Sequence, residues 1–367
     1  MQRFTPRLVV NKKVIAMLSH LALGGVWLAV IFIIRNFFPD NIKSIIWFNS
    51  SFVFYSFILS FGFTTLARLL VYERNIKVLR GGVYFSLILT LLVIAISFFF
   101  LSGDLLYLFP YIVIYNYLFL YLNISIAIKN YVYVAIYSML SLLCVFLGCV
   151  TFIIKSYELL TFSVTIFLFV SFYFKSQFNP KWCVLNFKFI ASTLSRAPIL
   201  LFAVMPLRGC IYLMGLVYSG EGVDVSDSVL YADLLIFQGV ISIFIGRAIL
   251  FNEKSIKNKL IKYSGVYFVF QSVIVTSFLI YINFFDGVNI LLLLLSSMLL
   301  SSRESFGAFV NLAVKNVMYK VCFIYTLCFC VASFNYYYFN NYYIWVFTFP
   351  FILNSFYFSK LLFRIKK

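Results

Sequence analysis

The sequence from residue 105 to residue 154 reads LLYLFPYIVIYNYLFLYLNISIAI, then Lys129 and Asn130, then YVYVAIYSMLSLLCVFLGCVTFII. Each apolar run is close to the ~20 residues that a helix needs to cross about 30 Å of hydrocarbon. Lys129 is the single charged residue in the whole stretch. This pattern predicts two membrane-spanning helices joined by a tight turn.

The same pattern extends along the chain, which is 64% hydrophobic and 11% charged. So much apolar surface cannot be buried in a water-soluble core, so the bilayer must serve as the solvent. We predict an all-α integral membrane protein with about 12 transmembrane helices in two six-helix bundles. The predicted spans are 14–34, 44–70, 81–101, 105–128, 131–154, 159–174, 197–218, 228–250, 260–283, 287–311, 318–338 and 342–363.

Basic residues concentrate in alternate connecting segments, which is the charge pattern of an inner-membrane protein with both termini in the cytoplasm. Of the 29 Lys and Arg, Arg35, Lys43, Lys155 and Arg208 depart from it. Acidic residues gather on the opposite side, at Asp40, Asp104, Glu158, Glu221, Asp224, Asp227, Asp233 and Asp286. The pattern predicts a multi-pass protein of the bacterial inner membrane.

Composition also narrows the function. The net charge of +18 is spread over short loops rather than forming an arm or patch, so we expect no nucleic-acid partner. Seven cysteines lie in or beside apolar runs and do not indicate disulfides. With one histidine, no Walker-type phosphate loop and no Gly-x-Ser-x-Gly motif, we expect no catalytic residues, no metal and no cofactor.

The chain divides into an N-terminal half, residues 1–176, a cytoplasmic linker, residues 177–196, and a C-terminal half, residues 197–367. The second span ends in Arg68-Leu-Leu-Val-Tyr-Glu-Arg-Asn-Ile-Lys77, and the eighth ends in a similar basic run from Arg247 to Lys257. Two halves with an even number of spans form a parallel repeat, whose substrate site is expected between the halves.

Arg208 lies near the middle of the seventh span, about 18 Å of helix from either end. A charge at that depth costs about 2.5–3.5 kcal/mol on insertion scales and should face a cavity or a partner. The planar donor fork of arginine suits a phosphate group. The alternative is a structural pair with Asp233 or with backbone carbonyls.

The other candidates have alternatives too. Pro206 and Gly209 beside Arg208, and Gly24 and Gly25 in the first span, are candidate hinges, although both residue types are common in membrane helices. His20 could contact a headgroup or exchange protons, or could be buried structurally. Asp233 is the candidate for ion coupling, or an exposed cap. The remaining candidates for substrate binding are basic residues that could instead be snorkelling anchors, namely Arg68, Arg247 and Arg303.

The second span contains Phe57-Ile-Leu-Ser-Phe-Gly-Phe-Thr-Thr-Leu-Ala-Arg68, and the chain resembles Wzx-type polysaccharide flippases of the multidrug and oligosaccharidyl-lipid exporter superfamily. The matching features are Gly62, Thr64, Thr65, Ala67 and Arg68 at the end of the second span, and Arg208, Gly220 and Tyr231 around the seventh and eighth. The resemblance implies a fold like that of the multidrug exporters.

What the resemblance implies for function is alternating access that moves a polyprenyl-pyrophosphate-linked oligosaccharide to the outer leaflet for O-antigen, capsule or exopolysaccharide synthesis. Membrane lipids, and polymerase and chain-length proteins of the same pathway, would be its partners. The alternatives are an oligosaccharide polymerase or other membrane glycosyl-transfer protein, an ion-coupled small-molecule exporter, and a proton-coupled sugar transporter.

Overall fold

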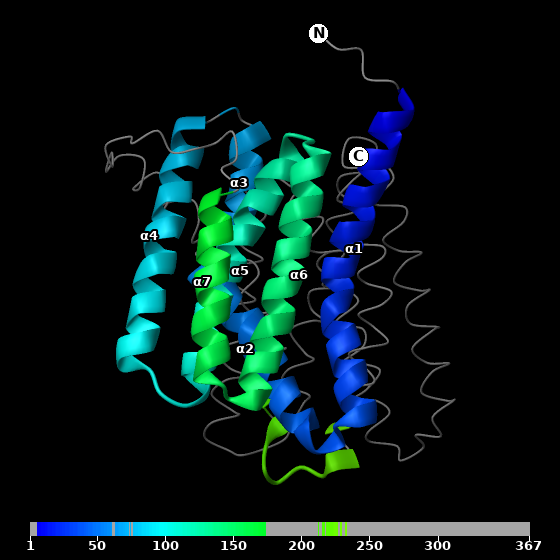
Figure 1. The fold of residues 1–367 in the computed structure, drawn as a ribbon, viewed down its shortest axis with the longest axis vertical. Coiled ribbons are helices and arrows are strands. Elements are labelled where there is room, and N and C mark those ends of the chain that lie inside the picture. The colour runs from blue at the N-terminus through cyan, green and yellow to red at the C-terminus, as the bar shows by residue number, and fades with distance from the viewer. Residues whose placement is uncertain are drawn as a thin grey trace, which may run out of the picture. The chain divides into compact units, whose positions relative to one another are not determined.

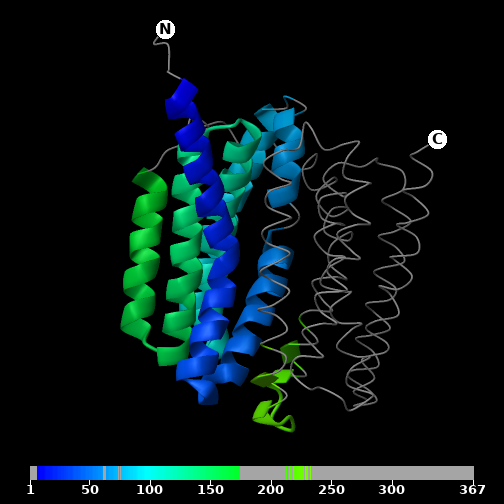
Figure 2. The same ribbon diagram turned by 90° about the vertical axis from the view of Figure 1, so that its right-hand side faces the viewer.

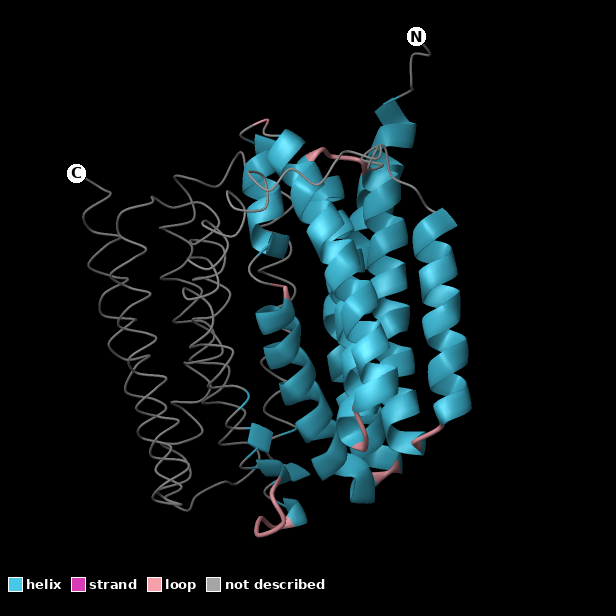
Figure 3. Cartoon of the chain, turned by 90° about the vertical axis from the view of Figure 1, so that its left-hand side faces the viewer, coloured by secondary structure: helices cyan, strands magenta, loops and turns pink. Residues whose placement is uncertain are grey.

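The computed structural model describes residues 6–60, 63–72, 74 and 76–173, and isolated positions between 212 and 232. The chain divides into two compact units, Met1–Leu201 and Phe202–Lys367. The described part of the first unit is entirely helical (Figure 3). Its elements are α1 (Pro6–Phe37), the 3₁₀ turn η1 (Pro39–Asn41), α2 (Ile42–Leu59), α3 (Phe63–Tyr72), α4 (Ile76–Phe100), α5 (Asp104–Ala127), α6 (Tyr131–Ile154) and α7 (Tyr157–Tyr173).

Five helices in the described residues are long and apolar enough to cross a membrane. They cover Lys12–Phe37, Pro39–Leu59, Val78–Phe100, Asp104–Ala127 and Tyr131–Ile154, and the apolar helix Tyr157–Val170 is shorter. The expected all-helical architecture is therefore confirmed for this part of the chain, and the five apolar helices support the expected multi-pass membrane protein. The spans expected from residue 197 onwards lie almost entirely outside the described residues.

The helices of the first unit run up and down alongside one another, and α5 lies at their centre (Figures 1 and 2). It contacts α2, α3, α4, α6 and α7, and α1 packs along α6. Tyr111 of α5 and Phe48 and Phe52 of α2 are among the largest fully buried side chains. Large apolar residues on α1, α4, α6 and α7 remain exposed, such as Leu92 and Phe169. Such a surface is suited to hydrocarbon rather than water.

The expected span 44–70 is wrong in one respect, because the structure divides it into α2 and α3. The hydroxyls of Ser56 and Ser60 donate to the carbonyls three residues earlier, a pattern that bends helices. The amide of Phe63 then donates to the carbonyl of Ser60 at 2.8 Å, in a turn tighter than an α-helix. Gly62, next to the break, has a low helix propensity.

A side chain from the central helix supports this interruption. Asn116 of α5 donates from Nδ2 to the carbonyl oxygen of Ser56 at 2.7 Å. That carbonyl also accepts from the amide of Ser60 at 3.1 Å, so Asn116 adds a second hydrogen bond in the last turn of α2. Beyond the break, α3 buries Phe63, Leu66 and Leu70 in the packing with α4 and α5. The helix that follows the break is therefore packed against protein.

Three described residues other than glycine have a positive φ, and all three are basic: Arg74 (56°), Lys129 (60°) and Lys155 (57°). Each follows the end of a helix, namely α3, α5 and α6. At Lys129 the amide of Asn130 donates to the carbonyl of Ser125, the bond that closes a Schellman motif. Glycine is favoured at such left-handed positions, and other residues cost roughly 1–2 kcal/mol there.

Candidate functional site

The charges of the first unit are separated between its two ends. We define the basic end as the end where α1, α4 and α6 begin and where α3 and α5 finish (Figure 1). Its described charged side chains are all cations: Lys12, Lys13, Arg74, Arg80 and Lys129. The described acids of this unit, Asp40, Asp104 and Glu158, lie at the opposite, mixed-charge end together with Arg35, Lys43 and Lys155. The basic residues of alternate connecting segments therefore lie together at one end of the first unit, and its described acids lie at the other.

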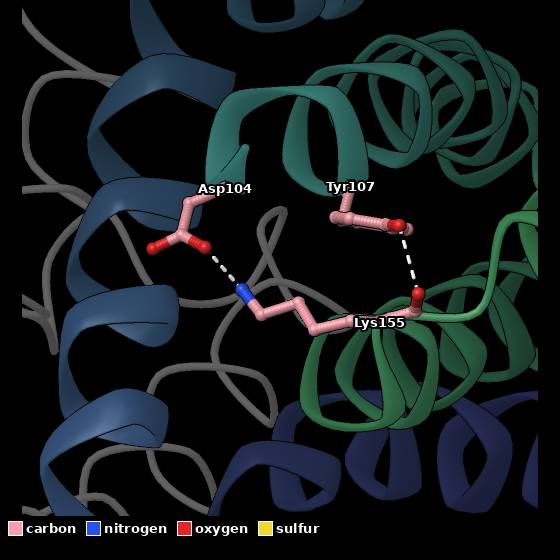
Figure 4. A network of polar contacts seen from close by, with 3 residues as sticks. All are labelled: Asp104, Tyr107 and Lys155. Carbon is pink, nitrogen blue, oxygen red and sulfur yellow. Dashed lines mark hydrogen bonds and ion pairs between the residues drawn. The ribbon is translucent and has the colours of Figure 1, made fainter. Parts of the chain in front are cut away.

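A polar network around Lys155 connects two loops at the mixed-charge end (Figure 4). The ammonium of Lys155 pairs with the carboxylate of Asp104, the first residue of α5, and lies 3.8 Å from the centre of the Phe152 ring. The Tyr107 hydroxyl donates to the Lys155 carbonyl at 2.8 Å. Both charges also suit their helix ends, because the anion begins one helix and the cation finishes another. Lys155, one of the exceptions to the basic pattern, is therefore neutralised locally.

A second network lies inside the bundle and joins α5, α6 and α7. The Tyr111 hydroxyl is 2.7 Å from Oγ1 of Thr151 and also hydrogen-bonds to Oγ of Ser163. Cys144 donates from Sγ to the Tyr111 carbonyl at 3.4 Å. The side chains are buried and hydrogen-bonded to one another, which fits a structural role better than contact with a substrate.

His20 is the one predicted substrate contact whose side chain the structure describes. It is 1% exposed and lies on the packed face of α1 together with Ala16 and Leu23. The candidate hinge at Gly24 and Gly25 falls within α1, which continues as an unbroken helix from Pro6 to Phe37. A Cβ placed on Gly25 would meet no atom within 4 Å, so packing does not require glycine there.

The other predicted site residues are described in part or not at all. Arg68 lies in α3, one turn before its end, and the structure describes its backbone but not its side chain. The remaining candidates lie outside the described residues: Arg208, Arg247, Arg303, Asp233, Pro206 and Gly209. The described part therefore brings no set of predicted substrate contacts together.

The second unit is described around one turn. Helical residues end at Ser219, and Val225 begins the next helical segment. Between them Glu221 and Asp224 are exposed, and the Ser228 hydroxyl donates to the Tyr218 carbonyl at 2.7 Å. The turn that the sequence predicts between the seventh and eighth spans is therefore short and carries exposed acids.

The Asn116 contact was not predicted from the sequence, and neither was the left-handed backbone at Arg74 and Lys129. Asn116 reaches a carbonyl 60 positions earlier, and no local pattern encodes that distance. Lys129 follows an apolar run and precedes an asparagine, a sequence consistent with a helix ending. No protein-family model, curated protein or solved structure matches this chain.

Proposed function

We propose that the protein is a flippase that moves oligosaccharides linked to polyprenyl pyrophosphate across the bacterial inner membrane by alternating access. The observation that carries the proposal is the brevity of the connections. Within residues 6–173 no described connection between helices exceeds a few residues. This part of the chain has no room for an extramembrane catalytic domain, which favours transport over the glycosyl-transfer alternative.

The proposed cargo contact is Arg208. Arginine remains protonated and offers paired donors to phosphate oxygens. His20, Arg68, Arg247 and Arg303 are secondary contacts in this proposal, and Asp233 is the candidate for coupling to an ion. We propose that the two halves rock against each other, with the candidate hinges at Gly24, Gly25, Pro206 and Gly209.

Sugar headgroups need a polar path through the protein to cross the membrane. Each hydroxyl left unsatisfied in hydrocarbon costs roughly 1–3 kcal/mol, so a headgroup of several sugars crosses lipid very slowly. A hydrated, cationic path lowers that barrier. We further propose that the basic end faces the cytoplasm, where lipid-linked oligosaccharides are assembled, and that the mixed-charge end faces outward.

The test is transport in proteoliposomes that hold a fluorescent polyprenyl-pyrophosphate oligosaccharide, measured as the fraction protected from a reagent outside. The wild type should exchange the lipid between leaflets without nucleotide. Arg208→Ala should slow exchange at least tenfold, and Arg208→Lys should retain part of it because the charge remains.

One outcome would contradict the flippase proposal, and another would contradict only the assignment of Arg208. Growth of the glycan chain without exchange would identify a polymerase. Normal transport by Arg208→Ala would remove that residue from the site while leaving the flippase proposal intact.

A further inference from the structure

Arg74, Lys129 and Lys155 form a matched set within one protein. All three are cations in the left-handed backbone region directly after a helix, a position that favours glycine. A long β-carbon-bearing side chain there strains the backbone, so its interactions must offset that strain. The three residues differ in the partners that their charged groups bind.

For Lys155 the partners are within the protein. Its ammonium pairs with Asp104 and lies against the Phe152 ring, which itself is 4.7 Å from the ring of Phe48 on α2. The backbone strain at Lys155 is thus offset by contacts inside the unit.

Arg74 and Lys129 differ in this respect. Both side chains are exposed, and neither has a hydrogen-bond or ion-pair partner among the residues that the structure describes. Both lie at the basic end, which they share with Lys12, Lys13 and Arg80. No described acid of the first unit lies at that end to neutralise them.

We propose that Arg74 and Lys129 bind the phosphate groups of anionic phospholipids at the basic end. Each cation follows a helix end at the basic end of an apolar bundle. Anionic headgroups at a membrane surface attract lysine and arginine. The helix C-terminus favours the cation, and the cation in turn bridges the helix end to a phosphate. This lipid contact does not depend on which cargo the protein carries.

Thermal unfolding in nanodiscs tests the inference, with phosphatidylcholine alone or mixed with phosphatidylglycerol. In phosphatidylcholine, the double variant Arg74→Gly with Lys129→Gly should melt at or above the wild-type Tm, because the strain is removed. Phosphatidylglycerol should raise the wild-type Tm, and this rise should be largely lost in the double variant. High salt should reduce the wild-type rise.

Lys155→Gly is the matched control, because the same backbone change there removes internal contacts. Its Tm should fall in both lipids, and the rise with phosphatidylglycerol should equal that of the wild type. An equal rise in the double variant would overturn the inference. A lower Tm of the double variant in phosphatidylcholine would also overturn it, because that result would reveal partners of the two cations within the protein. If the glycine variants do not fold, Arg74→Asn with Lys129→Asn provides the same comparison, since asparagine tolerates this backbone region.

Discussion

At the scale of single residues, Tyr111 links three helices through an ordered chain of hydroxyls. Ser163 donates to the Leu160 carbonyl at 3.0 Å, so its oxygen must accept from Tyr111. The Tyr111 hydroxyl has one proton and therefore accepts from Thr151. The hydroxyl protons of Thr151, Tyr111 and Ser163 are therefore all donated within the protein, and none of them remains for a ligand.

Tyr111→Phe should therefore reduce stability by about 1 kcal/mol, because two intramembrane hydrogen bonds are lost at roughly 0.6 kcal/mol each. Thermal unfolding in detergent measures the change. Tyr157→Phe is the control, since Tyr157 is 52% exposed and should tolerate loss of its hydroxyl. Identical melting of both variants and the wild type would refute the structural role of Tyr111.

At the scale of elements, the close approach of α3 to α4 depends on Gly82. A Cβ at this position would collide with the ring of Phe63, the first residue of α3. Gly82→Ala should cost about 1–3 kcal/mol by overpacking. Gly25→Ala in α1 has free space and should be neutral or stabilising, because alanine is the better helix former. Equal stability of the two variants would contradict the described packing of α3.

Hydropathy predicted some elements closely and others only in part, for identifiable reasons. The expected span 131–154 has the bounds of α6, because a long apolar run begins after Asn130, whose side chain caps the helix, and ends at Lys155. The interruption between α2 and α3 was not predictable from periodicity, because a contact from Asn116 supports it. His20 was placed correctly in a helix by its sequence, but its burial depends on the packing of α1.

At the scale of the whole molecule, the proposed flippase carries negative phosphates outward. An inside-negative potential assists each such charge by about 2.3 kcal/mol per 100 mV. A potassium gradient with valinomycin can make the compartment that the basic end faces negative. Transport in proteoliposomes away from that compartment should then accelerate. A rate that is independent of the imposed potential would show that net charge does not move in the rate-limiting step.

The sequence pattern and the helices agree on the separation of charge, because alternate short loops of an up-and-down bundle must meet at the same end. The proposed cargo site could be predicted from the sequence only as a set of residues. Arg208 and its candidate partners lie outside the described residues, so their mutual geometry stays a prediction. Distances between helices depend on packing, which hydropathy does not encode.

The proposed transport requires that the first unit crosses the membrane with its basic end in the cytoplasm. Single cysteines test this directly, after the seven native cysteines are replaced. Ser102 and Lys129 are exposed at opposite ends of α5. In intact spheroplasts, a membrane-impermeant maleimide should label Ser102→Cys at once and Lys129→Cys only after permeabilisation. Labelling of both from outside, or the reverse pattern, would contradict the proposed orientation and the flippase model built on it.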